Sequence, residues 1–409
     1  MTKRKHNEAL ETPLIKWPGG KSKEFQHFAE LIPQFERYVE PFFGGGGVFF
    51  RLQPSKALIN DVCLELVQFY RYVKGESGGD EFAKLLKSYA VTWTQAGVLS
   101  AKLMPDLKSI YVAQASAGSP EGDIRSSVDA VFEKNKAACS LLSDAPICLD
   151  KASFWGEIKD AVVEKMMRTA KLEKTKGKLP QGDLEKNIET GIRGGIYMYF
   201  RGMMNSLRNA PSSMMPLRIA NYYFIREFCY GSMFRYNSSG DFNIPYGGIG
   251  YNDKDFTGKV KRILSVEVKE LFSGAQIGNK DFEEFLKSAK VGEGDFMFLD
   301  PPYDTDFSAY ENAEFGQNDQ ARLAGFLARS KAKFMLVIKN TPFIYSLYAD
   351  KPGMRMAAFD KKYLYNVRGR NDREVEHLIV YNYEPPQGQL LSDAPPTRNP
   401  PAHPPAWWT

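Results

Sequence analysis

Cysteine and histidine are scarce in this chain of 409 residues, which has four of each. The spacing of the cysteines fits neither a disulfide framework nor a zinc site, and no histidine stands at metal-ligand spacing from a cysteine or a carboxylate. We therefore expect reduced thiols, no bound metal and a cytoplasmic protein. The cysteines are Cys63, Cys139, Cys148 and Cys229.

Long apolar runs are also missing. A membrane-spanning helix needs roughly 20 consecutive apolar residues, and no stretch approaches that length. The charged segment Met1–His6 is not followed by the apolar run of a signal peptide, so we expect no secretory leader. The sequence predicts a protein that does not associate with membranes.

Charge and aromatic content leave the partner open. The formal net charge is +5, and aromatic residues make up 13% of the chain. A mildly positive charge does not by itself indicate nucleic-acid binding, although a local basic cleft would serve. Aromatic residues that stack on bases and those of an ordinary core give the same percentage.

The first part of the chain has the order strand, glycine loop, helix, strand. Arg37–Glu40 is predicted as a short buried strand, Gly47–Arg51 opens a helix, and Lys56–Asp61 is a second strand that ends in an acid. This order defines one βαβ unit.

The composition changes after this unit. Residues 75–191 are rich in helix-forming residues, with Val162–Lys174 as a lysine-dotted helix and Thr175–Gly182 as a loop. No motif with a chemical role is present. We interpret the stretch as a largely helical insertion.

Basic and aromatic residues are interleaved with amides in residues 193–250. This pattern suits a nucleic-acid surface, and it equally suits a solvated face over an aromatic core. The arginines of the stretch are Arg193, Arg201, Arg208, Arg218, Arg226 and Arg235.

The alternation of strands and helices returns after about Arg262. Asp295–Asp300 and Lys333–Ile338 are predicted as buried strands, and Tyr363–Val367 with His377–Tyr381 as a β-hairpin. The Pro-rich stretch that follows has no core-forming pattern, so we expect a disordered tail at residues 384–409.

A glycine-rich turn, Glu40–Gly47, directly follows the first predicted strand. Glycines let a backbone pass close to a ligand, but this turn lacks the fingerprint of nicotinamide-dependent enzymes and the lysine of a phosphate loop. Asp61, at the end of the next strand, can accept both ribose hydroxyls of an adenosine-containing cofactor or cap a helix. The glycine loop before it favours the ribose role.

The run Lys16-Trp17-Pro18-Gly19-Gly20-Lys21 is compact and unusual. Its two glycines permit a tight turn, its lysines can neutralise a carboxylate, and Trp17 can cover an adenine or an apolar stem. A simple basic turn is the alternative.

The run Asp300-Pro301-Pro302-Tyr303 ends a predicted strand, and open α/β sheets bind ligands at the carboxyl ends of their strands. An exocyclic amine conjugated to a purine is a poor nucleophile. The Asp300 carboxylate and the Pro301 carbonyl can accept its N–H bonds and hold electron density on the nitrogen. The prolines stiffen the loop, and Tyr303 can stack on a base rotated out of the duplex. A proline turn that merely closes a strand is the alternative.

Together these motifs resemble the Dam-type family of DNA adenine-N6 methyltransferases, in the circular order that places the lysine-tryptophan motif first. The resemblance covers roughly residues 12–73 and 220–383. It implies S-adenosylmethionine as cofactor, duplex DNA as partner and catalysis by Asp300, Pro301, Pro302 and Tyr303. The cofactor-binding residues that it implies are Trp17, Lys21, Glu40, Phe42, Gly44, Gly46, Asp61, Asp281, Phe282 and Asp300.

Two further segments are similar to the family. Arg235–Gly247 is similar to the segment before its final half and implies that Arg235, Asn237 and Asn243 contact DNA. Arg373–Tyr383 resembles its last hairpin. The chain departs from the family at Tyr230, where asparagine is frequent, and at His377, where leucine is common.

The sequence thus predicts an α/β, Rossmann-like methyltransferase with an inserted, largely helical recognition domain. Its catalytic domain comprises residues 12–74 and 262–383, and the recognition region residues 75–261. Methylation of cytosine-N4, RNA or a protein amide, and a catalytically silent DNA-binding subunit, remain as alternatives. We expect a monomer, with a cognate restriction endonuclease as a candidate partner.

Overall fold

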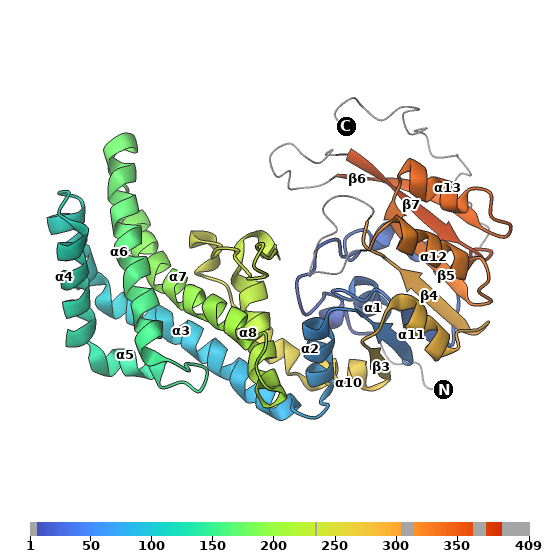
Figure 1. Cartoon of the computed structure of the whole chain (residues 1–409), viewed down its shortest axis with the longest axis horizontal. Helices are drawn as coiled ribbons and strands as arrows, with labels where there is room; N and C mark the ends of the chain where they lie inside the picture. Colours follow the sequence, from blue (N-terminus) through green and yellow to red (C-terminus); the bar gives the residue numbers. More distant parts are fainter. Residues whose placement is uncertain (1–5, 234, 304–314, 363–373, 387–409) are drawn as a thin grey trace. The chain divides into compact units, whose positions relative to one another are not determined.

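The computed structural model describes residues 6–233, 235–303, 315–362 and 374–386. The chain divides into two compact units. We call residues 1–13, 19–70 and 270–409 the sheet unit, and residues 14–18 and 71–269 the helical unit. Figure 1 shows the strands of the first and the long helices of the second.

The sheet unit is built on seven strands in the order β3-β2-β1-β4-β5-β7-β6. The first five are parallel, and β7 is antiparallel to both β5 and β6. The strands are β1 (Arg37–Glu40), β2 (Ala57–Asn60), β3 (Ala275–Gly278), β4 (Asp295–Leu299), β5 (Lys333–Lys339), β6 (Arg355–Lys362) and β7 (Glu374–Tyr381).

Alternate residues of the central strands face opposite layers of the sheet unit. Val39, Met297 and Leu299 pack in one core with the apolar sides of α11, α12 and α13. Tyr38 and Phe296 face the other layer, where the Tyr38 ring lies 6.4 Å from that of Phe49 in α1. Burial on both faces explains why the central strands are almost continuously apolar. The helices of this unit, including two that cross its boundary, are α1 (Gly47–Leu52), α2 (Leu64–Lys74), α10 (Val266–Ser273), α11 (Phe282–Ala289), α12 (Gln317–Leu327) and α13 (Pro342–Tyr348).

The helical unit has an aromatic core. The Trp93 ring of α3 lies 4.0 Å from that of Phe228 in α8, and the Tyr89 ring lies 4.7 Å from that of Phe200 in α7. Its helices are α3 (Gly79–Ile110), α4 (Glu121–Lys134), α5 (Lys136–Ser143), α6 (Lys151–Lys176), α7 (Gln181–Leu207), α8 (Met215–Phe228) and α9 (Phe256–Ile263). The helical unit also has a π-helical turn, η4 (Tyr111–Ala115), and the short 3₁₀ turns η5 (Ser212–Met214), η6 (Tyr230–Ser232) and η7 (Ile249–Tyr251). The 3₁₀ turns of the sheet unit are η1 (Glu8–Leu10), η2 (Phe25–His27) and η3 (Ala29–Leu31).

This architecture confirms the Rossmann-like fold class and the inserted helices predicted from the sequence. The loop predicted at Thr175–Gly182 is too long, because α6 continues to Lys176 and α7 begins at Gln181. Gly177, with φ of 87°, ends α6. Tyr363–Val367 and most of the predicted tail lie outside the described residues.

Candidate active site

The strand order of the sheet reverses between β1 and β4. From β1 the chain proceeds to β2 and β3 on one side, whereas β4 and β5 lie on the other. Ligands of open α/β sheets bind outside the carboxyl ends of the strands at such a switch point. Glu40 ends β1 and Asp300 directly follows β4, so both predicted site residues lie at this position.

Lys21 holds the Asp-Pro-Pro-Tyr motif in place. Its Nζ donates hydrogen bonds to Oδ1 of Asp300, to the Tyr303 hydroxyl at 2.9 Å and to the Gly19 carbonyl at 3.1 Å. The Lys21 side chain is 1% exposed, and that of Asp300 is 17% exposed. A cation this deeply buried needs a charged and hydrogen-bonded environment, and these three acceptors supply it.

The rest of the motif is fixed by two residues far away in the sequence. Gln320 of α12 donates a hydrogen bond of 2.8 Å to the Pro302 carbonyl. Nε2 of His377 in β7 lies 3.1 Å from the Tyr303 hydroxyl. Both Gln320 and His377 are fully buried. The loop after β4 is therefore tied to α12 and β7 as well as to Lys21.

The glycine loop and Asp61 form one hydrogen-bonded structure. Asp61 accepts bonds from the backbone N–H groups of Gly44 at 2.8 Å and Cys63 at 3.0 Å. Gly44 and Gly46 have φ of 49° and 69°, a region that favours glycine. A side chain at Gly46 would collide with the Phe43 ring. Asp61 thus fixes the path of the loop in which we expect the cofactor.

Burial raises the pKa of two of the three acids at this edge of the sheet, Glu40 and Asp61. It raises the pKa of Glu40 well above its ordinary value, and the charges of Asp300 and Asp61 raise it further, against the bond of 2.9 Å that the Tyr38 hydroxyl donates. Burial also raises the pKa of Asp61, although the N–H groups of Cys63 and Gly44 oppose the shift. The protonated form of Glu40 is favoured, which lowers the charge repulsion among the three carboxyl groups.

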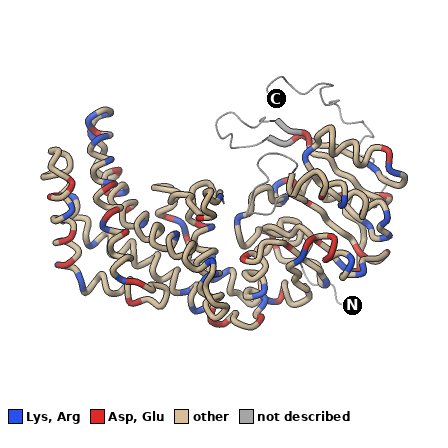
Figure 2. Tube along the Cα trace, in the orientation of Figure 1, with Lys and Arg blue, Asp and Glu red and all other residues tan. Residues whose placement is uncertain are grey.

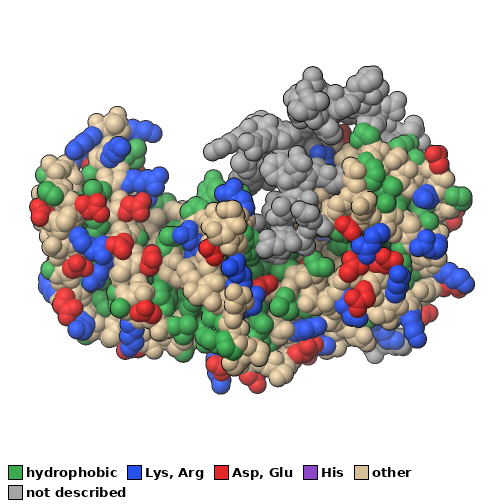
Figure 3. Space-filling view, viewed as in Figure 1, with side chains coloured by type: hydrophobic (Ala, Val, Ile, Leu, Met, Phe, Trp, Pro, Cys, Tyr) green, Lys and Arg blue, Asp and Glu red, His purple; other side chains and the backbone are tan. Residues whose placement is uncertain are grey.

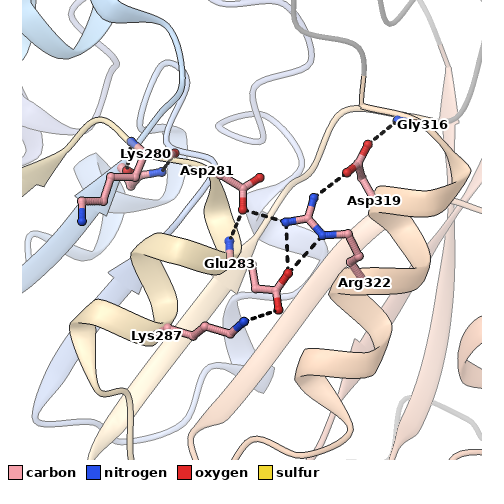
Figure 4. Close-up of polar contacts among 8 residues, drawn as sticks. Lys280, Asp281, Glu283, Lys287, Gly316, Asp319 and Arg322 are labelled. Carbon is pink, nitrogen blue, oxygen red and sulfur yellow. Dashed lines mark hydrogen bonds and ion pairs between the residues drawn. The ribbon is translucent and has the colours of Figure 1, made fainter.

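Asp281 and Phe282 are held by Arg322 of α12, as Figure 4 shows for the polar contacts. Asp281 Oδ1 accepts from Arg322 at 2.8 Å and from the Glu283 N–H at 2.9 Å, where it caps α11. The guanidinium lies 4.9 Å from the centre of the Phe282 ring, and that ring lies 5.4 Å from Phe42. Contacts through Arg322 and the Phe282 ring thus bring together three residues predicted to bind the cofactor, Phe42, Asp281 and Phe282.

Trp17 belongs to the helical unit, whereas Lys21 belongs to the sheet unit. Arg226 of α8 lies over the Trp17 ring at 4.6 Å and donates a bond of 2.8 Å to the Lys16 carbonyl. Arg226 is fully buried. A buried arginine therefore holds the first half of the lysine-tryptophan motif against α8.

The arginines of residues 193–250 divide into structural and exposed ones. Arg193 is 7% exposed, pairs with Glu189 at 2.6 Å and donates to the Trp93 carbonyl, so it stabilises the helical core, as does Arg226. Arg235 is exposed. Neither the nucleic-acid surface nor the solvated face fits these two arginines, because both are buried within the helical unit.

The predicted DNA-contacting amides differ from each other. The Asn237 side chain accepts from the N–H groups of Ser239 and Asp241 and so stabilises its own turn. Asn243 is exposed, and its carbonyl accepts from Arg201 at 3.4 Å. Asn237 has a structural role whether or not it contacts DNA.

Sequence reasoning missed four residues that position the site: Gln320, Arg322, His377 and Arg226. The unexpected histidine in the last hairpin was a signal for His377. The others lie on helices with no motif of their own. Within the described ranges, no helix has the length and apolarity to cross a membrane.

Fold and site together define an α/β methyltransferase with an Asp-Pro-Pro-Tyr motif at the switch point of its sheet. The sequence model of the D12 class N6 adenine-specific DNA methyltransferases matches residues 17–96 and 182–367. The chain belongs to this family of DNA-methylating enzymes, and the resemblance predicted from its motifs is confirmed.

Curated relatives agree with this assignment. The chain is 24% identical over 379 residues to the type II methyltransferase M.CviBI of Paramecium bursaria Chlorella virus NC1A, covering 91% of this chain and 99% of the relative. It is 24% identical over 391 residues to the type II methyltransferase M.MjaIII of Methanocaldococcus jannaschii, with the same shares. It is 33% identical over 138 residues to the retron Ec67 DNA adenine methylase of Escherichia coli, covering 32% and 45%.

Proposed function

We propose that this enzyme transfers the methyl group of S-adenosylmethionine to N6 of an adenine within a specific sequence of duplex DNA. In this proposal the Asp300 carboxylate accepts a hydrogen bond from the N6 amino group. The observation that carries the proposal is the Lys21–Asp300–Tyr303 arrangement at the switch point. The family supplies the type of reaction, and this arrangement supplies a place for it.

The residues at the carboxyl edge fit this cofactor. Asp61 holds the glycine loop and, as a carboxylate with about four acceptor sites, can also accept ribose hydroxyls. Phe42, which is half-buried, offers aromatic surface to an adenine and packs against the buried Phe282, with Asp281 beside them. The Asp300 carboxylate suits a positively charged sulfonium. When bound, S-adenosylmethionine supplies an electrophilic methyl group, whose bond to sulfur breaks as the adenine nitrogen bonds to it.

The protein's own groups orient the adenine. Asp300, kept in place by Lys21, accepts a hydrogen bond from the amino group and holds the nitrogen lone pair toward the methyl group. The Pro301 carbonyl is the second acceptor. Tyr303, anchored by Lys21 and His377, presents its ring to a base that has left the helix. No strong base is needed, because the amino proton leaves after the new bond forms.

The other assignments of the proposal concern the units and the partners. We assign catalysis to the sheet unit and target recognition to the helical unit, with Arg235, Asn237 and Asn243 as DNA contacts. We further propose a cytoplasmic monomer, and a restriction endonuclease of the same specificity as its partner. Light scattering of the purified protein tests the monomer.

The proposal is tested by incubating the purified enzyme with labelled S-adenosylmethionine and either duplex DNA or RNA. We expect label in the DNA only, and none with Asp300→Ala. Calorimetry with S-adenosylmethionine provides the control, because Asp300→Ala should keep measurable cofactor binding. Transfer at the wild-type rate by Asp300→Ala would remove the assigned role of the carboxylate.

A further inference from the structure

A basic groove lies on α6 in the helical unit. It has a volume of about 330 Å³, and no carboxylate is among its lining residues in the described part of the chain. Its α6 residues fall between the two segments that the family model matches. The lining residues are Lys165, Arg168, Thr169, Lys171, Leu172, Thr175 and Asn187.

The groove rests on a tightly packed pair of helices. A side chain at Gly195 of α7 would lie 2.3 Å from the Cα of Ile158 in α6, and one at Gly191 would lie 3.0 Å from that of Val162. These two glycines therefore let the helices approach closely. Asn187 lies one turn before Gly191 on α7, so it continues the same face into the groove. The groove has a rigid base.

Two cations in the first half of α6 form ion pairs, whereas the cations of the groove form none with the residues that the structure describes. Lys151 pairs with Asp144 at 2.6 Å, and Lys159 pairs with Asp129 at 2.9 Å, both from the first half of α6. Lys165, Arg168 and Lys171 form no ion pair with any residue that the structure describes. In the second half of α6, these three positive charges are thus not neutralised by an ion pair with any described residue.

The folded helix does not explain this charge. Cations in the last turn of a helix are stabilised by its dipole, but Lys165, Arg168 and Lys171 all precede the last turn of α6, which ends at Lys176. Like charges three residues apart destabilise a helix. Burial lowers the pKa of Lys165, and the charge of Arg168 lowers it further, although the charge of Glu164 opposes the shift. A bound anion would reduce the repulsion between these like charges and would favour the charged form of Lys165.

Figure 2 shows Lys and Arg positions gathered at the end of α6, and Figure 3 shows their side chains on the surface there. Ammonium, guanidinium, hydroxyl and amide groups are the donors that proteins use for the DNA backbone. We propose that this groove binds phosphate groups of the DNA substrate and anchors the duplex independently of its sequence. The inference rests on the proposed function, because it takes DNA as the substrate.

The test removes three charges from the groove and three from elsewhere in the same unit. The groove variant is Lys165→Gln, Arg168→Gln, Lys171→Gln, and the matched control is Lys87→Gln and Lys102→Gln on α3 with Lys261→Gln on α9, all exposed lysines without an ion pair to a described residue. Binding to a fluorescent 30-base-pair duplex is measured by anisotropy over a range of NaCl concentrations. Each phosphate contact contributes about 0.9 to the slope of log K against log salt.

We expect the groove variant to bind about tenfold more weakly near 0.1 M salt, with a slope smaller by about 1–2, and the control to bind like wild type. Unchanged binding by the groove variant, or an equal loss in both variants, overturns the proposal. Unchanged melting temperature and S-adenosylmethionine affinity establish correct folding, and Arg168→Gln alone, at an exposed position, gives a smaller loss if the triple variant is unstable. Methyl transfer by the wild type in the same preparations tests the proposed function separately.

Discussion

Lys21 forms an ion pair with Asp300, although 279 residues separate them in the sequence. The pair joins the segment before β1 to the loop after β4, and it is the contact through which the lysine-tryptophan motif and the catalytic motif meet. Lys21 also binds the Tyr303 hydroxyl. One buried cation therefore orients both side chains that the proposed reaction needs.

Replacing Lys21 by methionine should nearly abolish methyl transfer. Without Lys21, the Asp300 carboxylate and the Tyr303 hydroxyl lose the cation that positions them, and a misplacement of about 1 Å can cost about 100-fold in rate, so we expect kcat/KM to fall at least about 100-fold. Steady-state transfer to duplex DNA measures it. Lys23→Met is the control for loss of a nearby positive charge, since Lys23 is exposed and has no ion pair with any described residue. Wild-type activity in Lys21→Met would contradict the role assigned to the pair.

His377 is a positioning residue for Tyr303. His377→Leu fills the buried position with an apolar side chain and removes the hydrogen bond to the Tyr303 hydroxyl. Such a bond is worth about 0.5–1.5 kcal/mol. We expect kcat to fall roughly 2–10-fold with little change in KM for S-adenosylmethionine. His377→Gln, which can still bond the hydroxyl, should recover part of the loss. Equal kinetics for the leucine and glutamine variants would show that the bond does not matter.

Glu40 should make the protein less stable as the pH rises. Its pKa is higher in the folded chain than its ordinary value of 4.5, so the folded state binds more protons than the unfolded state. Stability is then lost as the pH rises from about 4.5 through the raised folded value. Glu40→Gln removes the pH dependence of stability that comes from Glu40, whereas the part that comes from Asp61 remains.

We therefore expect the melting temperature of the cofactor-free protein to drop less between pH 5 and pH 8 in Glu40→Gln than in wild type, by at least about 2 °C. Thermal unfolding followed by circular dichroism at several pH values measures the difference. The same drop in both proteins would mean that Glu40 ionises normally.

Arg322 should affect cofactor affinity and not the chemical step. It is 41% exposed, so its ion pairs are worth less than about 1 kcal/mol. We expect Arg322→Gln to raise KM for S-adenosylmethionine by roughly 2–5-fold at unchanged kcat, because Asp281 and Phe282 lose their common support. Lys287→Gln is the control, since Glu283 is the one described residue with which Lys287 forms an ion pair. A fall in kcat with constant KM would refute this role.

The sequence predicted the central strands well because their signals are local. Buried apolar runs bounded by glycines and acids identified β1, β2 and β4 within a residue or two, and the loop after β4 followed from its prolines. Lys21 was expected to approach a carboxylate, but which one depended on the strand order, which no local pattern reveals.

Tertiary packing determined the remainder. Arg226 belongs to a stretch whose arginines suited either a nucleic-acid surface or a solvated face over an aromatic core, and its complete burial against the Trp17 ring fits neither. Gln320 and Arg322 act across the sheet unit from a helix without a motif. The groove of α6 required the position of α7 beside it, because its lysines alone resemble an ordinary solvated face.

The most direct test is the modified base itself. DNA from a bacterial host without adenine methylation, expressing either the wild-type chain or Asp300→Ala, is analysed by nucleoside mass spectrometry and long-read sequencing. The account predicts N6-methyladenine at one recurring sequence with the wild type and none with Asp300→Ala. N6-methyladenine at wild-type levels with Asp300→Ala, or N4-methylcytosine with the wild type, would contradict it.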